Sequence, residues 1–265
     1  MPDVFRCTKC GNESETWALA CPACGAADRL IAVTRQDSAG FKASPRDGAI
    51  EILSDVQTQN ESRIFSGFSA LDSALGGGFV RGSVVLLAGA PGAGKSTLAL
   101  QAASFVSLDH PALYVSGEEP LDRLQEKARR LHLDVTRLQC CTYTEIGALS
   151  RALRAEIPAI VVVDSLHTIS NDRIRSRPGS SSQLIGAAHS FVRLAQTLDM
   201  GVFLIGHVTR INNLSGPRSV EHVVDVMLHF NVKGKKRLLY ASKNRFGPAN
   251  ENYPLKMTAS GLVDD

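Results

Sequence analysis

Short runs of apolar residues recur along the chain after residue 60, and amphipathic stretches separate them. A continuous apolar run predicts a strand that is buried on both faces, as in a parallel sheet. Such runs occupy 84–88, 112–116, 160–163 and 202–205. Helices are predicted where one face is charged or where apolar residues recur at spacings of three and four. These stretches are 98–106, 121–131 and 184–198.

From residue 223 onward the pattern changes to consecutive strands, at 223–230, 237–241 and 253–257. The alternation of strands and helices before this point predicts an α/β fold, with a mainly parallel sheet and helices on both faces. Consecutive strands predict antiparallel additions at the C-terminal end of that sheet. We therefore expect residues 61–265 to form one α/β domain.

The residues before this domain have a different composition. Four of the six cysteines lie within residues 1–30, and residues 31–60 are mixed and polar, which predicts a small module followed by a linker. No apolar stretch reaches the length of a membrane span, and the N-terminus lacks the apolar segment of a signal peptide. We expect a cytoplasmic protein with no membrane partner. The net charge of +3 does not by itself indicate nucleic-acid binding.

The N-terminal cysteines form two CxxC pairs separated by ten residues. The four are Cys7, Cys10, Cys21 and Cys24. Two such pairs can place four thiolates tetrahedrally around Zn²⁺. Gly11 and Gly25 follow the pairs, where a tight turn needs a permissive backbone. Two disulfides or a redox pair are the alternatives, but disulfides are rare in cytosolic proteins. The pattern favours a structural zinc ribbon in residues 1–30.

The strand predicted at 84–88 leads into a phosphate-binding loop of the pattern GxxxxGK[ST]. Its residues are Gly89, Ala90, Pro91, Gly92, Ala93, Gly94, Lys95, Ser96 and Thr97. Glycines let the backbone N–H groups point at a polyphosphate, and the helix that follows favours anions at its N-terminus. Lys95 can reach the β- and γ-phosphates, and the Ser96 hydroxyl can bind Mg²⁺. We expect binding of ATP with Mg²⁺; a glycine-rich surface turn is the alternative.

Three carboxylates follow predicted strands. Asp164 ends the run 160–163, at a strand tip that lies beside the phosphate loop in open α/β sheets, where it can hold Mg²⁺. Glu118 and Glu119 follow the run 112–116, where a carboxylate can activate the attacking water. We assign Glu118 as the base, assisted by Glu119. The alternatives are a turn residue for Asp164 and a helix N-terminus for the two glutamates.

Two further groups lie near predicted strand ends. Lys243 and Arg245 are alternate residues, so both cations point the same way. They could reach a γ-phosphate across a subunit boundary, as an arginine finger does. His207 and Thr209 follow the run 202–205 and could sense the γ-phosphate. An exposed hairpin and a structural histidine are the respective alternatives.

Two loops after strand tips carry several arginines. The first holds Arg173, Arg175 and Arg177, and the second holds Arg210 and Arg218. Arginine suits bidentate phosphate contacts. Neither loop has an aromatic residue for base stacking, so we expect contact with a DNA backbone without sequence reading. A solvated surface is the alternative.

Together these residues resemble the bacterial RadA (Sms) family of DNA-repair ATPases, relatives of RecA and of DnaB-type helicases. The most specific elements are the four-cysteine module with Trp17 between its pairs, the phosphate loop, 114–119, 162–165, 206–209 and the Lys-Asn-Arg-Phe-Gly motif at 243–247. The resemblance implies a RecA-like ATPase core in a homo-oligomeric ring, expected to be a hexamer, that binds single-stranded DNA and aids branch migration. It also implies that Lys243 and Arg245 act on a neighbour's nucleotide and that the arginine loops face DNA.

The resemblance further implies recombinase-type repair proteins as partners and branched DNA as a substrate. Family members normally carry an additional domain that resembles the Lon protease, and this chain stops just after Gly261-Leu262, so we expect a short form without it. The expected function is DNA-dependent ATP hydrolysis in recombinational repair. A KaiC-like regulatory ATPase or autokinase is one alternative, although the cysteine module and the motif at 243–247 argue against it. A non-motor ATP-binding adaptor for repair proteins is the other.

Overall fold

The structure is a computed structural model and describes residues 4–7, 10–14, 18, 20–27, 30–33, 63–207, 220–234 and 236–265. The chain divides into two compact units, Met1–Thr58 and Gln59–Asp265. None of the helices within the described ranges is long and apolar enough to cross a membrane.

The first unit contains a small antiparallel sheet in the order β2-β1-β3. Its strands are β1 (Val4–Cys7), β2 (Glu13–Ser14) and β3 (Leu30–Val33). Cys7 is the last residue of β1, so this sheet fixes one of the four N-terminal cysteines directly.

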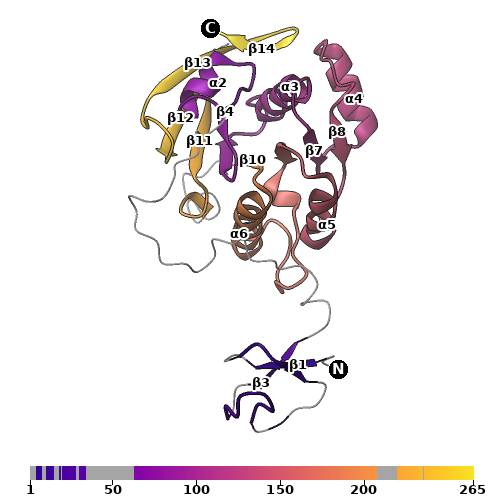
Figure 1. Cartoon of the computed structure of the whole chain (residues 1–265). Helices are drawn as coiled ribbons and strands as arrows, with labels where there is room; N and C mark the ends of the chain where they lie inside the picture. Colours follow the sequence, from indigo (N-terminus) through magenta and orange to yellow (C-terminus); the bar gives the residue numbers. More distant parts are fainter. Residues whose placement is uncertain are drawn as a thin grey trace. The chain divides into compact units, whose positions relative to one another are not determined.

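The second unit is built on a single large sheet (Figure 1). Its strands are β6 (Val84–Gly89), β7 (Ala112–Ser116), β8 (Gln139–Cys141), β9 (Ile160–Asp164), β10 (Gly201–His207), β11 (Val226–Lys233), β12 (Lys236–Asn244), β13 (Asn252–Thr258) and β14 (Gly261–Asp264). Their order is β14-β13-β12-β11-β6-β10-β9-β7-β8. The pairs from β11 to β8 are parallel, and β12, β13 and β14 are added antiparallel. This arrangement confirms the predicted α/β fold.

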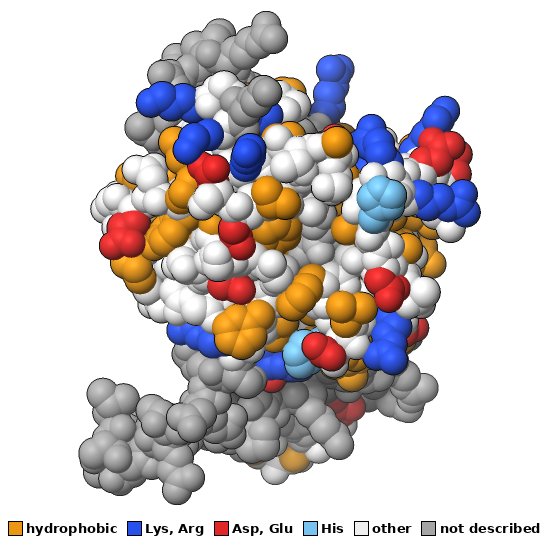
Figure 2. All heavy atoms as spheres, turned by 90° about the horizontal axis from the view of Figure 1, so that it is seen from above, with side chains coloured by type: hydrophobic (Ala, Val, Ile, Leu, Met, Phe, Trp, Pro, Cys, Tyr) orange, Lys and Arg blue, Asp and Glu red, His pale blue; other side chains and the backbone are white. Residues whose placement is uncertain are grey.

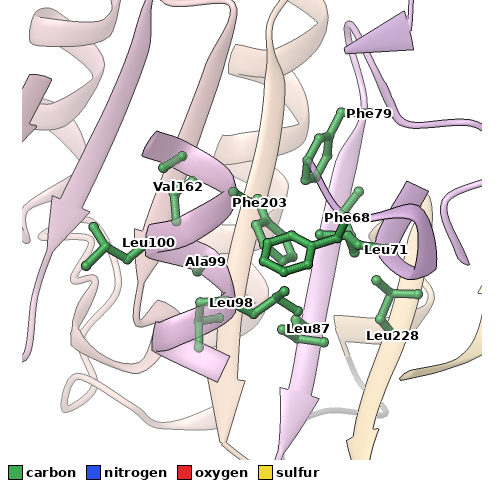
Figure 3. Packing of buried hydrophobic residues seen from close by; sticks show 14 of the residues in the cluster. Phe68, Leu71, Phe79, Leu87, Leu98, Ala99, Leu100, Val162, Phe203 and Leu228 are labelled. Atoms are coloured by element: carbon green, nitrogen blue, oxygen red, sulfur yellow. The ribbon is translucent and has the colours of Figure 1, made fainter. Parts of the chain in front are cut away.

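Helices cover both faces of the sheet. On one face, α2 (Ser69–Ala74), α3 (Lys95–Ser107) and α4 (Leu121–Arg130) pack in one hydrophobic cluster, and on the other α5 (Ile146–Glu156) and α6 (Ser181–Leu198) pack in a second. Successive residues of β6 alternate between these clusters, because side chains of a strand point to opposite faces. Figure 3 shows the first cluster, with Leu98 of α3 close to Leu87 and Phe203 of the sheet.

Three short elements complete the described part of this unit. The strands β4 (Arg63–Ile64) and β5 (Phe79–Val80) pair antiparallel, and the 3-10 turn η2 (Leu166–Thr168) follows β9. Seen from above in Figure 2, the face beside α3 and β14 exposes hydrophobic side chains between charged ones, and Phe105 and Val263 of these elements are exposed. Scattered apolar side chains of this kind are usual on protein surfaces.

The structure differs from the sequence prediction in several elements. The strand expected from residue 223 begins at Val226, because the preceding residues form a turn that bonds to β6 through Asp225 N–H and the Val84 carbonyl. Helix α3 begins at Lys95, three residues before the predicted start. In the second unit, the elements β4, α2, β5, α5 and β14 lie outside the predicted set. Cys140 lies on the edge strand β8 and is exposed.

Candidate nucleotide site and its surroundings

The phosphate loop connects the end of β6 to the start of α3. Gly94 has a left-handed backbone with φ of 105°, and a Cβ atom built there would meet Cε of Met257 at 2.8 Å. The loop is also braced from the antiparallel part of the sheet, because Arg237 donates from Nε to the Ala93 carbonyl at 2.8 Å. The sequence analysis did not identify Arg237, because its bond to Ala93 joins two residues that are 144 positions apart in the sequence.

Lys95 lies inside the loop with only 3% of its surface exposed. Its Nζ donates to the carbonyls of Gly89 and Ala90, both at 2.9 Å. Burial lowers the pKa of the Lys95 ammonium below its ordinary value, and the nearby charges of Asp164 and Glu118 act in the opposite direction. The ammonium and these two carboxylates therefore share one site.

Asp164 is the last residue of β9 and is buried. The Tyr114 hydroxyl donates to Asp164 Oδ2 at 2.7 Å, whereas Oδ1 is buried and has no hydrogen-bond partner among the described residues. A buried carboxylate oxygen without a donor is costly unless a cation binds it. The Ser96 hydroxyl is at the start of α3, so an oxygen-ligand set for Mg²⁺ fits here. Sequence reasoning did not identify Tyr114 as a site residue.

The two adjacent glutamates have different surroundings. Glu118 is exposed, and its Oε1 accepts a hydrogen bond from the Ser165 hydroxyl. Glu119 forms an ion pair with Lys127 of α4, with 3.2 Å between Oε1 and Nζ. The Glu119 carbonyl also accepts from the Ser116 hydroxyl. Glu118 thus lies on the side of Lys95 and Asp164, and Glu119 is bound to the neighbouring helix.

Lys243 and Arg245 both contact the segment 220–225. Lys243 Nζ donates to the carbonyls of Glu221 at 2.8 Å and Val224 at 2.7 Å. Arg245 Nη1 lies 2.7 Å from Asp225 Oδ1, and 57% of the Arg245 side chain is exposed. Both cations therefore have hydrogen-bond partners in the segment 220–225 of the same chain.

The other sensor and loop residues fall mostly outside the described ranges. His207 ends β10, but nothing is described of its side chain, and Thr209, Arg210 and Arg218 lie outside the described residues.

The first arginine loop is described in full. Arg173, Arg175 and Arg177 are exposed. Gln183 of α6, which is 2% exposed, holds this loop: its amide nitrogen donates to the carbonyls of Asn171, Ile174 and Ser176, at 3.0 to 3.1 Å. Its side-chain oxygen accepts from Asn171 N–H at 2.8 Å. The sequence analysis did not identify Gln183, because it precedes the predicted helix 184–198 and its burial is known only from the structure.

The four N-terminal cysteines come together in the first unit. The Sγ atoms of Cys7, Cys10, Cys21 and Cys24 all lie within 4.8 Å of one another. Two of the sulfur pairs, Cys10–Cys21 and Cys7–Cys24, are 3.6 and 3.8 Å apart, and none of the four cysteines is in a disulfide. Since Zn–S bonds of about 2.3 Å in a tetrahedron separate sulfur atoms by about 3.8 Å, this set fits Zn²⁺. Gly11 and Gly25 have φ of 74° and 70°, and each donates its N–H to the carbonyl of the first cysteine of its pair.

Comparisons with known proteins agree with the residues at the site. The profile of the AAA domain family matches residues 52–212. The DNA repair protein RadA of Pseudomonas aeruginosa is 39% identical to the chain, over 98% of the chain and 59% of the RadA protein. RadA of Bacillus subtilis is 34% identical, over 98% of the chain and 59% of its own length. The chain thus spans less than two thirds of the curated relatives it matches.

Two solved structures share the fold of the second unit. A KaiC-like protein of Pyrococcus horikoshii has a TM-score of 0.65 and 19% identity, covering 78% of this chain and 100% of that chain. The RadB recombinase has a TM-score of 0.59 and 23% identity, covering 76% of this chain and 99% of that chain. At these identities the likeness concerns the fold alone, which is RecA-like. The chain therefore belongs to the AAA domain family and is a RadA-type member of it.

Proposed function

We propose that this chain is a Mg²⁺-dependent ATP hydrolase that acts on DNA during recombinational repair. The observation that carries the proposal is the convergence of Lys95, Asp164 and Glu118, which follow or end the strands β6, β9 and β7 of one parallel sheet. A cation for the phosphates, a carboxylate for the metal and a carboxylate for the water are the groups that phosphoryl transfer to water requires.

The chain's own residues have separate roles in this proposal. The backbone N–H groups of the loop 89–97 and the N-terminus of α3 bind the phosphates, and Lys95 exchanges its bonds with the Gly89 and Ala90 carbonyls for phosphate oxygens. Asp164 and Ser96 would hold Mg²⁺, which when bound neutralises charge on the phosphate oxygens. Glu118 orients the attacking water and accepts its proton. Glu119, which is ion-paired with Lys127, has a structural role beside it in this proposal.

Lys243 and Arg245 complete the site of a neighbouring subunit in a homo-oligomeric ring. Their position at the end of β12 and the exposed side chain of Arg245 favour this role. A cation from a neighbour stabilises the charge that develops on the γ-phosphate, as an arginine finger does. Engagement of that phosphate requires exchange of the present contacts with the segment 220–225.

DNA is the proposed substrate, in single-stranded or branched form, with recombinase-type repair proteins as partners. The exposed arginines of the loop anchored by Gln183 provide phosphate contacts without base readout. The loop that carries Arg210 and Arg218 is proposed to act with it. The names of the curated relatives, DNA repair protein RadA, support the assignment to repair.

ATP turnover measured with and without single-stranded DNA tests the proposal. We expect Mg²⁺-dependent turnover that rises with DNA, and DNA affinity that falls steeply with salt because phosphate contacts release counterions. Lys95→Ala should abolish turnover. Absence of both stimulation and salt-sensitive DNA binding would exclude a DNA-dependent ATPase. Labelled phosphate transferred from ATP to the protein itself would instead favour the KaiC-like autokinase.

The zinc assignment has its own test. We propose that the four cysteines bind one structural Zn²⁺, which stabilises a unit too small to form a sufficient core. Cys10→Ser should lower the zinc content and unfold this unit, measured by metal analysis and by proteolysis. Cys140→Ser is the matched control, because this exposed thiol lies in the other unit. Equal zinc content in both variants would contradict the assignment.

A further inference from the structure

Two hydroxyl groups hold the two proposed catalytic carboxylates, and each comes from the strand that does not carry its carboxylate. Tyr114 lies on β7 and donates to Asp164 of β9 at 2.7 Å. Ser165 directly follows β9 and donates to Glu118, which follows β7. We call these four residues the cross-strand lock.

The lock is built on neighbouring parallel strands with a fixed register, in which Ser116 lies opposite Asp164. The backbone crosses at the same point, because Gly117 N–H donates to the Asp164 carbonyl at 2.7 Å. The donors themselves are immobilised: Tyr114 and Ser165 are both fully buried. Each hydroxyl is therefore held within a packed core, which limits the orientations that its carboxylate can adopt.

The backbone next to the cross-strand lock is closely packed against Thr168. A Cβ atom at Gly117 would overlap the Thr168 hydroxyl, and that hydroxyl donates to the Ser165 carbonyl at 2.8 Å. The lock also leaves one oxygen of Asp164 without a described partner, so the Tyr114 bond presents Oδ1 for another ligand.

We propose that Tyr114 and Ser165 are reciprocal positioning residues: Tyr114 orients Asp164 toward the metal, and Ser165 orients Glu118 toward the attacking water. This inference rests on the proposed function and adds the means by which the chain fixes both carboxylates before nucleotide binds. Outer hydrogen bonds of this kind typically set the orientation of metal ligands and of catalytic bases.

Because each hydroxyl bonds to the carboxylate of the other strand, the inference predicts which measured property each variant should change. We first measure the affinity for a non-hydrolysable ATP analogue with and without Mg²⁺. Tyr114→Phe should reduce the gain in affinity that Mg²⁺ provides by about 10-fold, since removing a second-shell partner of a metal ligand costs that much or more. The affinity without Mg²⁺ should stay the same. Ser165→Ala should leave the Mg²⁺ gain unchanged.

Turnover at saturating Mg²⁺ and ATP is the second measurement. Ser165→Ala should lower kcat about 10-fold, because a misdirected base loses part of its effect. In the Glu118→Gln background the same change should add little, since the partner of Ser165 is then already altered. If each residue only supported its own strand, the effects would be exchanged. Tyr114→Phe would then lower kcat, and Ser165→Ala would reduce the gain in affinity that Mg²⁺ provides.

The controls remove hydroxyls elsewhere in the unit. Tyr240→Phe loses a bond to Asn250, and Ser104→Ala loses a partly buried bond to the Asp134 carbonyl. Thermal unfolding checks that all variants fold. If Tyr114→Phe does not fold, Ser165→Ala and its double-mutant cycle test the same lock from the other strand.

The outcomes separate this inference from the proposed function. A wild-type protein whose analogue affinity gains nothing from Mg²⁺ overturns both. A normal wild-type gain that Tyr114→Phe leaves intact, or a kcat that Ser165→Ala leaves intact, overturns the lock alone. The crossed pattern of losses supports it.

Discussion

Glu118 and Asp164 receive hydrogen bonds from buried hydroxyls of neighbouring strands, whereas Lys243 and Arg245 bond to the segment 220–225. The carboxylate half of the proposed hydrolysis site, Glu118 and Asp164, is thus arranged within one chain. The cation half, Lys243 and Arg245, is bonded to the segment 220–225 instead. In the proposed function, Lys243 and Arg245 are therefore the groups through which assembly of subunits would regulate hydrolysis.

The two cations also differ from each other. Lys243 Nζ contacts three carbonyls of the segment 220–225, at 2.7, 2.8 and 3.4 Å, so its three N–H donors are all directed at the backbone. Burial lowers the pKa of Lys243, with Arg245 adding to the effect and Asp225 and Glu221 opposing it. Arg245 places Nη1 against Asp225, and more than half of its side chain is exposed. A guanidinium has five N–H donors, so Arg245 can meet a phosphate with the smaller rearrangement.

The largest expected effect is therefore that of Arg245→Ala on turnover, about 10³-fold, the lower end of the range for arginine fingers. The control is a mixing experiment with Lys95→Ala, which lacks a working phosphate loop but keeps its cations. Mixed oligomers should regain turnover, because each variant supplies what its neighbour lacks. Two variants that stay inactive when mixed would place the cation and the loop of one active site in the same chain.

Glu118→Gln tests the carboxylate half, with an expected loss in kcat of about 10²- to 10³-fold, as for removal of a general base. Affinity for ATP should change little, since the loop 89–97 is intact. Glu119→Gln is the matched control on the adjacent residue, and its effect should be a few-fold at most because it breaks a half-exposed ion pair with Lys127. Equal losses in the two variants would mean that the hydrogen bond from Ser165 does not distinguish the base.

The parts of this site that could be predicted from the sequence are those fixed by local pattern. The apolar runs of β6, β7 and β9 define their own strands, and the loop glycines with Lys95 define the phosphate site. Asp164 could be placed because a residue at the tip of a parallel strand faces the ligand side of the sheet.

The parts that could not be predicted depend on which strands become neighbours. Tyr114 reads as one more apolar residue of a buried run, and only the pairing of β7 with β9 brings its hydroxyl to Asp164. The contacts of Lys243 depend on a turn at 220–225 that the apolar pattern assigned partly to a strand. In both cases the deciding hydrogen bond joins residues far apart in sequence, which no local period records.

A stability measurement tests how strongly Asp225 binds Arg245. Asp225 is buried, and its carboxylate accepts from Arg245 and from Val84 N–H. Asp225→Asn keeps an acceptor but removes the charge, so the free energy of unfolding should fall by about 1.5 to 2 kcal/mol, the lower part of the range for charged hydrogen bonds.

The matched control for this measurement is Asp199→Asn. Asp199 pairs with Arg81 at 3.6 Å and its side chain is 74% exposed, so its loss should cost less than about 0.5 kcal/mol. Urea unfolding of both variants gives the comparison directly. If Asp225→Asn costs no more than the control, Arg245 is not held by this contact and needs no release.

The smallest expected effect is a pH dependence of stability that arises next to the segment 220–225. His229 of β11 contacts the Ser242 hydroxyl at 3.0 Å, and Ser242 in turn donates to Glu221 of the segment that binds Lys243. Burial lowers the pKa of His229 below its ordinary value of about 6.5, with the Glu221 charge opposing the shift. The unfolded chain therefore takes up a proton at a higher pH than the folded chain.

It follows that stability is fully present above about pH 6.5 and decreases as the pH falls from there toward the lower pKa of the folded state. A single proton gives a slope of at most about 1.4 kcal/mol per pH unit, and a partly buried histidine should give less. Urea unfolding of His229→Gln between pH 7.5 and roughly 5 should show a flatter profile than the wild type. His110→Gln, at an exposed position, is the control. A profile that His229→Gln leaves unchanged would separate this histidine from the segment that holds the cations.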